Sequence, residues 1–183
     1  ASDQGGLFYA LKDSTIQNLR RTDVKIRTQT GFVGAVARYA ISNNIFENIV
    51  VDGLIGASGT SYGLGGLVAC VGHENDFGNT YFIRCINRAR IDGSKSQHVG
   101  GLLGAANQSG DNIYFYSCAN EGSIVADSAT GYVLRYGYLQ KDATLEVIGF
   151  TQLGTVNGQT GSICSAPGSD YFYLTQYADG TQY

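Results

Sequence analysis

Short apolar stretches recur along the chain, each introduced by glycine and followed by a polar segment. They read GGLFYA, GFVGAVA, GGLVACV, GGLLGAA, GYVLRYG and GSICSA, and they begin at Gly5, Gly31, Gly65, Gly100, Gly131 and Gly161. Their starts lie about 30 residues apart, and a recurring period of this length is typical of stacked repeat architectures.

A second strand-like stretch follows each of the first five starts. These stretches read IQNLRRTDVKI, FENIVVDGLIG, IRCINRARIDG, YSCANEGSIVA and IGFTQLGTVNG. Aligned without gaps, they form two apolar columns: Ile16, Phe46, Ile83, Tyr116 and Ile148 in the first, and Val24, Leu54, Ile91, Ile124 and Val156 in the second. Apolar and polar positions alternate roughly with period two, while helical spacing is poorly sustained, so the pattern predicts short strands.

A unit of this length cannot bury its apolar face alone, whereas stacked units bury a continuous core between them. Equivalent strands then lie in register as parallel ladders, about 4.8 Å apart. The sequence therefore predicts an all-β fold, a parallel β-solenoid (β-helix) of about six coils in which residues 1–183 form a single domain. The crossover rule for parallel strands favours right-handed winding. The glycines that open each unit are expected at tight bends or close backbone approaches.

Two of the four cysteines occupy equivalent positions on neighbouring units. Cys85 and Cys118 stand in FIRCINRARIDG and FYSCANEGSIVA, so stacking should place one above the other, in a column that continues as Asn18, Asn48 and Phe150. That separation is compatible with a disulfide, and the ordinary alternative is a ladder of buried, reduced thiols that act as small apolar residues. No bond is expected between Cys70 and Cys164, which lie about three coils apart in different columns.

The stretches GGLVAC and GGLLGA, with their C-x-N-x-x-x-I strands and Gly/Ser-rich turns, resemble the GLUG-motif repeats of large bacterial surface proteins. Those proteins include adhesins and some immunoglobulin-A-specific metallopeptidases. The resemblance is clearest over Gly65–Val133. It implies an extracellular, cell-surface repeat module that serves as a non-catalytic stalk or binding segment, and it brings no catalytic residues.

Candidate chemistry elsewhere has an ordinary structural alternative in each case. The polar loop GHENDFGN holds His73, Glu74 and Asp76, but it lacks the spacing of a calcium loop and is expected to be a solvated turn. His98 is expected to be a surface residue. Asn107 opens the triplet NQS in a predicted loop and is a candidate glycosylation site.

Neither an ice-binding nor a catalytic surface is favoured. The pair of threonines in RTQT, at Arg27–Thr30, does not recur on later units. Asp52, Asp92 and Asp127 fall at recurrent turn positions, where aspartate is common, and no second carboxylate accompanies them consistently. We therefore expect no enzyme, and neither a cofactor nor a metal. A carbohydrate-binding or carbohydrate-cleaving β-helix is the alternative.

Charge and composition narrow the class of partner. The net charge of −3 is too small to indicate nucleic acid, and no apolar run is long enough for insertion into a membrane. Residues 1–40 carry a net charge of +3 and residues 141–183 a net charge of −3. These oppositely charged ends suggest a structural or adhesive module whose copies stack head to tail into a filament, or a piece whose flanking repeats cover its ends. A host or matrix glycan or protein would be the further partner.

Overall fold

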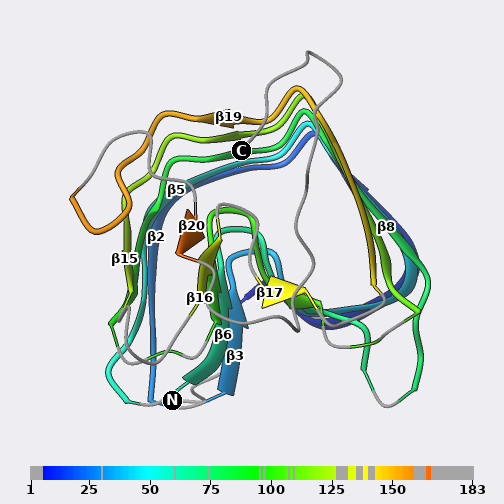
Figure 1. Ribbon diagram of the computed structural model, residues 1–183, viewed down its shortest axis with the longest axis horizontal. Coiled ribbons are helices and arrows are strands. Elements are labelled where there is room, and N and C mark those ends of the chain that lie inside the picture. The colour runs from blue at the N-terminus through cyan, green and yellow to red at the C-terminus, as the bar shows by residue number, and fades with distance from the viewer. Residues whose placement is uncertain are drawn as a thin grey trace.

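The computed structural model describes residues 6–29, 31–59, 61–73, 75–94, 96, 98–106, 108, 110–126, 132–134, 138–139, 143–158 and 164–165. These residues form strands and turns and no helix, and the chain winds as a β-solenoid of about four turns (Figure 1). The predicted fold class is confirmed.

The strands follow one another around successive turns of the solenoid. The first turn contains β1 (Phe8–Gln17), β2 (Arg20–Thr28) and β3 (Gly31–Gly34), and the second contains β4 (Ala37–Glu47), β5 (Val50–Ala57) and β6 (Ser61–Gly65). The third contains β7 (Val68–Val71), β8 (Asn79–Ile83), β9 (Ile86–Asn87), β10 (Arg90–Gly93) and β11 (His98–Gly100). The fourth contains β12 (Leu103–Ala106), β13 (Asn112–Tyr116), β14 (Ala119–Asn120), β15 (Ile124–Ala126) and β16 (Tyr132–Leu134). Beyond it lie β17 (Tyr138–Leu139), β18 (Thr144–Ile148), β19 (Thr151–Gln152) and β20 (Cys164–Ser165).

Stacking of these turns generates three sheets. The first contains β17-β12-β7-β4-β8-β13-β18, with β1 also paired to β4. The second contains β15-β10-β5-β9-β14-β19, with β2 paired to β5, and the third contains β20-β16-β11-β6-β3. Every pairing between described strands is parallel except that of β20 with β16.

The predicted number of six coils is too high. The start predicted at Gly31 is also three residues early, because Gly34 and not Gly31 pairs with Gly65 and so occupies the equivalent position on its turn. The unit at Gly161 does not continue the parallel stack, since Cys164 in β20 pairs with Leu134 in the antiparallel sense. The right-handed winding stays a prediction, because strand order and register are the same for either hand.

The predicted register is correct between the later turns and is one residue out between the second and third. Ile83, Tyr116 and Ile148 do pair in one column, and Ile91, Ile124 and Val156 pair in the other. In the earlier turns, however, Phe46 pairs with Phe82 rather than Ile83, and Ile55 rather than Leu54 pairs with Ile91. A shift of one residue turns a side chain to the opposite face of a strand, so the slip exchanges core and surface positions.

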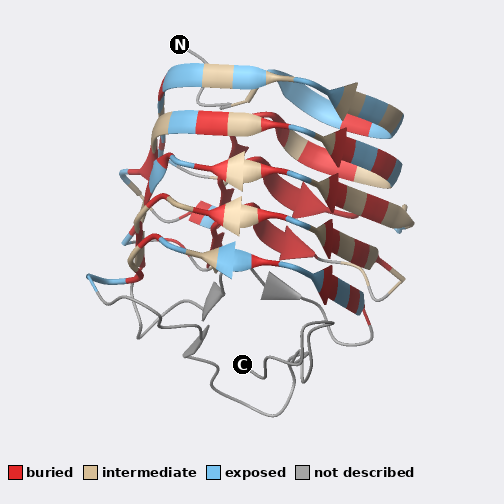
Figure 2. Ribbon diagram, turned by 90° about the horizontal axis from the view of Figure 1, so that it is seen from above, coloured by how far each residue is buried: buried red, intermediate tan, exposed pale blue. Residues whose placement is uncertain are grey.

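Stacked aromatic rings form part of the core. Phe46, Phe82 and Phe115 are fully buried on consecutive turns, with ring centroids 5.2 and 4.8 Å apart and nearly parallel planes. Figure 2 shows buried residues along the inner turns and many exposed residues on the turn nearest the N-terminal end. Among the described strands, the inner turns have neighbours on both sides, whereas the first turn has a neighbour on one side only.

A left-handed backbone conformation marks the corner between the first and second sheets. The residues there are Asn18, Asn48, Arg84, Ser117 and Gly149, with φ between 50° and 70°. Asn18 and Asn48 therefore belong to this outer column and not to that of the cysteines, which corrects the predicted column. Asparagine and glycine adopt this conformation readily.

Two further sequence features have a direct structural role at the inner corners. A Cβ atom added to Gly65 would lie 1.9 Å from the carbonyl oxygen of Val68, so the glycine permits the close backbone approach that its position suggested. Asn87 and Asn120 are fully buried on consecutive turns. The Nδ2 atom of Asn87 donates to Oδ1 of Asn120 at 2.8 Å and to the carbonyl oxygen of Ala89 at 3.1 Å, while Oδ1 of Asn87 accepts the Ala89 N–H at 3.1 Å.

Candidate functional site: the outer face of the first sheet

The cysteines predicted to stack do so. Cys85 and Cys118 follow the left-handed corner residues on adjacent turns, and the N–H of Ala119 donates to the carbonyl oxygen of Cys85. Both are free, buried thiols, and each donates to a carbonyl oxygen of the preceding turn, Cys85 to Phe46 and Cys118 to Phe82, at 3.2 Å. Contact with Cys118 and burial raise the pKa of Cys85, so this thiol stays protonated. The disulfide stays a prediction.

The polar loop around His73 forms a tight turn. Backbone N–H groups of His73 and Asp76 each donate to the other's carbonyl oxygen, and Asn75 between them has a φ of 67°. His73 packs edge-on against Tyr39, with ring centroids 4.4 Å apart, and Asp76 pairs with Lys12 at 2.6 Å. Within the described part of the chain, no cluster of three or more His, Cys, Asp or Glu side chains could hold a metal ion.

The other sequence-predicted positions do not converge. Asp52 is exposed and Asp92 half-buried in the second sheet. Asp127 and the candidate glycosylation site Asn107 lie outside the described residues. His98, expected at the surface, is half-buried, and burial lowers its pKa to about 4.

One buried carboxyl group was not singled out from the sequence. Asp111 is fully buried beside Gly72, and its Oδ2 atom accepts the backbone N–H of Gln108 at 3.0 Å. Its Oδ1 atom has no hydrogen-bond partner among the described residues. Burial raises the pKa of Asp111 to about 6.

An ordered array of outward-facing side chains lies on the outer face of the first sheet, which is formed there by β1, β4, β8, β13 and β18. Along β8, the buried residues Thr80 and Phe82 alternate with the half-buried Asn79, Tyr81 and Ile83, and β13 repeats this alternation. Strict alternation directs one set of side chains into the core and the other outward. In-register pairing then arranges the outward set in columns across the turns.

A row of polar side chains forms one of these columns. The Oδ1 atom of Asp13 accepts the backbone and side-chain N–H groups of Asn43, at 3.3 and 3.2 Å. Oδ1 of Asn43 in turn accepts the backbone N–H of Asn79 at 3.2 Å, and Oδ1 of Asn79 accepts Nδ2 of Asn112 at 3.1 Å. Hydrogen bonds from Asn43 lower the pKa of Asp13, so its carboxylate stays ionised at neutral pH.

Tyrosines form the neighbouring column. Tyr81 and Tyr114 stack with centroids 4.4 Å apart and planes inclined by only 10°. Tyr116, two residues farther along β13, donates its hydroxyl to Oε1 of Glu146 at 2.7 Å. Desolvation and the neighbouring Glu146 raise the pKa of Tyr116 to about 12, so the hydroxyl keeps its proton.

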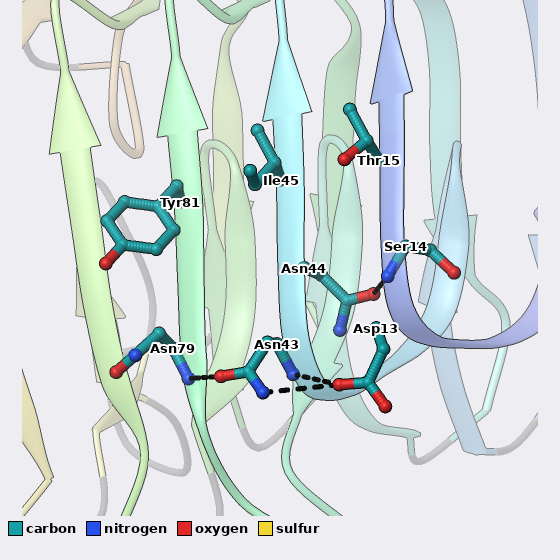
Figure 3. A pocket seen from close by; sticks show the side chains of 8 residues that line it. All are labelled: Asp13, Ser14, Thr15, Asn43, Asn44, Ile45, Asn79 and Tyr81. Atoms are coloured by element: carbon teal, nitrogen blue, oxygen red, sulfur yellow. Dashed lines mark hydrogen bonds between the residues drawn. The ribbon is translucent and has the colours of Figure 1, made fainter.

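An open hollow of about 390 Å³ lies where the two columns meet on the first three turns (Figure 3). It is lined by Asp13, Ser14, Thr15, Asn43, Asn44, Ile45, Asn79 and Tyr81. Tyr81 occupies the same column as Ile45 and Thr15, whose side chains are shorter, so the surface steps down beside the ring. The hollow therefore combines an aromatic wall with amide, hydroxyl and carboxylate groups, a mixture that suits a ligand with both apolar and polar faces.

Sequence reasoning missed this hollow, although a signal for its columns exists. Asparagine precedes phenylalanine by three residues in NNIF, NTYF and NIYF, at Asn43–Phe46, Asn79–Phe82 and Asn112–Phe115. Aligning the three turns on this spacing places the outer asparagines in one column and the buried phenylalanines in another. It also gives the correct register between the second and third turns.

The sequence matches no family model, and neither the curated proteins nor the solved structures compared with it show significant similarity. Among the described residues there is also no helix with the length and apolar character needed to cross a bilayer. Fold and side-chain geometry are thus the basis for any functional assignment.

Proposed function

We propose that the chain is a non-catalytic, extracellular building element of a surface fibre or stalk, with an adhesive side face, and that its copies contact one another end to end. The observation that carries this proposal is the uncovered edge of the first turn. Among the described strands, β1, β2 and β3 each pair with only one neighbour. A long strand edge with unpaired N–H and C=O groups favours the addition of another strand.

Apolar side chains accompany this edge. Leu7, which precedes β1, and Phe8 and Tyr9 at its start are 48%, 40% and 57% exposed. Phe8 occupies the column of Ala37 and Val68, both of which are fully buried one and two turns farther along. A further coil seated on the first turn would bury Phe8 in the same way, and the burial of apolar surface would stabilise the contact.

The charge distribution supports another copy as the occupant. Strand β2 presents Arg20, Lys25 and Arg27 as exposed residues on the first turn. Residues 141–183 carry a net charge of −3, so a head-to-tail contact brings opposite charges together. Such a heterologous contact does not close on itself and therefore produces a filament. Flanking repeats of a longer chain are the competing occupant of this edge.

Association of the purified protein tests the end-to-end contact. Sedimentation and electron microscopy should show rods that lengthen with protein concentration and shorten in high salt. Phe8→Glu places a charge in the contact and should abolish lengthening, whereas Phe77→Glu, at a position 54% exposed in the turn before β8, should leave it unchanged. A wild-type protein that stays monomeric at millimolar concentration rules out self-stacking and leaves flanking repeats as the cover. A screen for reducing ends released from polysaccharides tests the absence of catalysis.

A further inference from the structure

We propose that the hollow beside Tyr81 binds a pyranose unit of a neutral glycan, with the sugar ring stacked on Tyr81 and its hydroxyls hydrogen-bonded to the row formed by Asp13, Asn43 and Asn79. This inference rests on the adhesive part of the proposed function and names the ligand class of that side face. It does not depend on the end-to-end contact.

Tyr81 is the aromatic side chain that lines the hollow. Its ring is stacked on Tyr114 at 4.4 Å, which covers the face directed toward the fourth turn. On the other side of its column, the neighbour of Tyr81 is Ile45 on the second turn, which also lines the hollow. Because Tyr114 fixes the ring on its other side, the platform is held in place before a ligand arrives, which lowers the entropic cost of binding.

The polar row supplies donors and acceptors in fixed orientations. Asn43 accepts from Asn79 through Oδ1 and donates to Asp13 through Nδ2, so its amide cannot flip without losing both hydrogen bonds. Asn79 is oriented likewise by accepting from Asn112. Each side-chain amide has two N–H groups and a carboxylate has several lone pairs, so the row retains groups that can pair with adjacent sugar hydroxyls.

Charge selects a neutral ligand over an acidic one. The Asp13 carboxylate at the end of the row stays ionised, as described above, and contributes negative charge to the hollow. The nearby cation Lys12 is already paired with Asp76 at 2.6 Å. A sialylated, sulfated or uronic-acid glycan would place its own negative charge beside Asp13, and like charges at short range repel.

The backbone excludes an extended peptide as an added strand at this position. Strands β1, β4 and β8 run beneath the hollow and pair with one another, from Ser14↔Asn44 and Asn44↔Thr80 onward. The backbone groups between these strands are engaged within the sheet, and among the described strands the open edge here is the outer side of β1. A peptide added as a strand would therefore sit at the end of the stack and not on the outward side chains of β4 and β8. Recognition must come from the outward side chains, whose combination of a flat ring and amides matches the apolar and hydroxylated faces of a pyranose.

The test uses a printed panel of neutral oligosaccharides built from glucose, mannose, galactose or N-acetylglucosamine, with sialylated and sulfated glycans beside them. Binding of the best neutral oligosaccharide is then measured in solution by calorimetry or ligand-observed NMR. Tyr81→Ala and Asn43→Ala should each weaken it at least about tenfold, the loss expected when a stacked ring or an oriented hydrogen bond is removed. Tyr81→Phe keeps the platform and should stay within about threefold of wild type.

Two further variants keep the test decisive. Thr15→Tyr fills the hollow without removing any of the proposed contacts and should also abolish binding. Tyr62→Ala removes a tyrosine that is 55% exposed on the third sheet and should change nothing. The proposal is overturned if no neutral oligosaccharide binds at millimolar concentration, if acidic glycans bind in preference, or if folded Thr15→Tyr binds like wild type. The concentration-dependent lengthening of rods is measured in parallel for the Tyr81→Ala protein. This measurement separates failure of the present inference from failure of the end-to-end contact.

Discussion

Replacing Asn87 by aspartate tests whether the buried asparagines hold the stacked corners together. The amide of Asn87 makes three hydrogen bonds: it donates to Asn120 Oδ1 and Ala89 O, and it accepts from Ala89 N. An ionised aspartate can still accept but cannot donate. The variant therefore leaves two buried acceptors, on Ala89 and Asn120, without donors, and both face a carboxylate oxygen.

The size of the effect follows from these lost contacts. Each buried acceptor left without a donor costs about 1–3 kcal/mol, so the free energy of unfolding should fall by about 2–6 kcal/mol before charge is considered. Burial among acceptors raises the pKa of the introduced carboxyl group above its unfolded value of about 3.9. Because the pKa of the introduced carboxyl group is higher in the folded state, the loss in free energy of unfolding is smallest at pH values below the unfolded pKa. It grows as pH rises through the folded pKa.

Urea unfolding followed by far-ultraviolet circular dichroism, at pH values from 4 to 8, measures this deficit. Asn48→Asp is a matched control, because Asn48 is exposed and donates a single side-chain hydrogen bond to Asn18. It should cost less than about 1 kcal/mol. The reasoning is refuted if Asn87→Asp is as stable as this control at pH 8, or if its deficit is the same at pH 4 and pH 8.

Two other substitutions probe the core and the buried carboxyl group. Phe82→Ala removes the central ring of the buried ladder and should lower the free energy of unfolding by about 3–5 kcal/mol in chemical denaturation; a loss below about 1 kcal/mol would contradict the packing. Asp111→Asn should stabilise the protein at pH 8, by up to about 3 kcal/mol, and much less at pH 4, because a carboxyl group whose folded pKa is raised to about 6 destabilises the fold as pH rises through that value. Thermal unfolding profiles of wild type and Asp111→Asn that stay parallel from pH 4 to pH 8 would count against this assignment.

The fold could be predicted from the sequence because period and alternation are both visible in it. Glycine-led starts and apolar columns are sufficient to indicate a parallel stack, and the register from Ile83 onward is correct. Between the second and third turns the gap-free alignment was one residue out, because Phe46 pairs with Phe82 and Ile55 with Ile91. Between the first and second turns β2 is irregular between Arg21 and Val24, so that Val24 pairs with Gly53 and not with Leu54. Gap-free alignment cannot accommodate such an irregularity.

The candidate site was harder to predict because it depends on differences between turns and not on what they share. Tyr81 and Ile45 lie 36 residues apart in sequence, and the hollow arises because their side chains differ in length at paired positions. A one-residue slip would have placed Tyr81 opposite Asn44, whose side chain is buried. Recognition of the asparagine–phenylalanine spacing would have removed that slip, but the volume of the hollow still requires the three-dimensional register.

Pairing of each turn with only the turns above and below has a consequence for how such a molecule changes in evolution. Asn79 and Asn112 are 33 residues apart, occupy equivalent places and hydrogen-bond to each other. Recombination between the DNA encoding them would insert or remove one whole layer while leaving both joints native in geometry. The height of the particle would change by a single strand spacing, about 4.8 Å. Length in this architecture is thus inherited as a copy number, separately from the chemistry of any one layer.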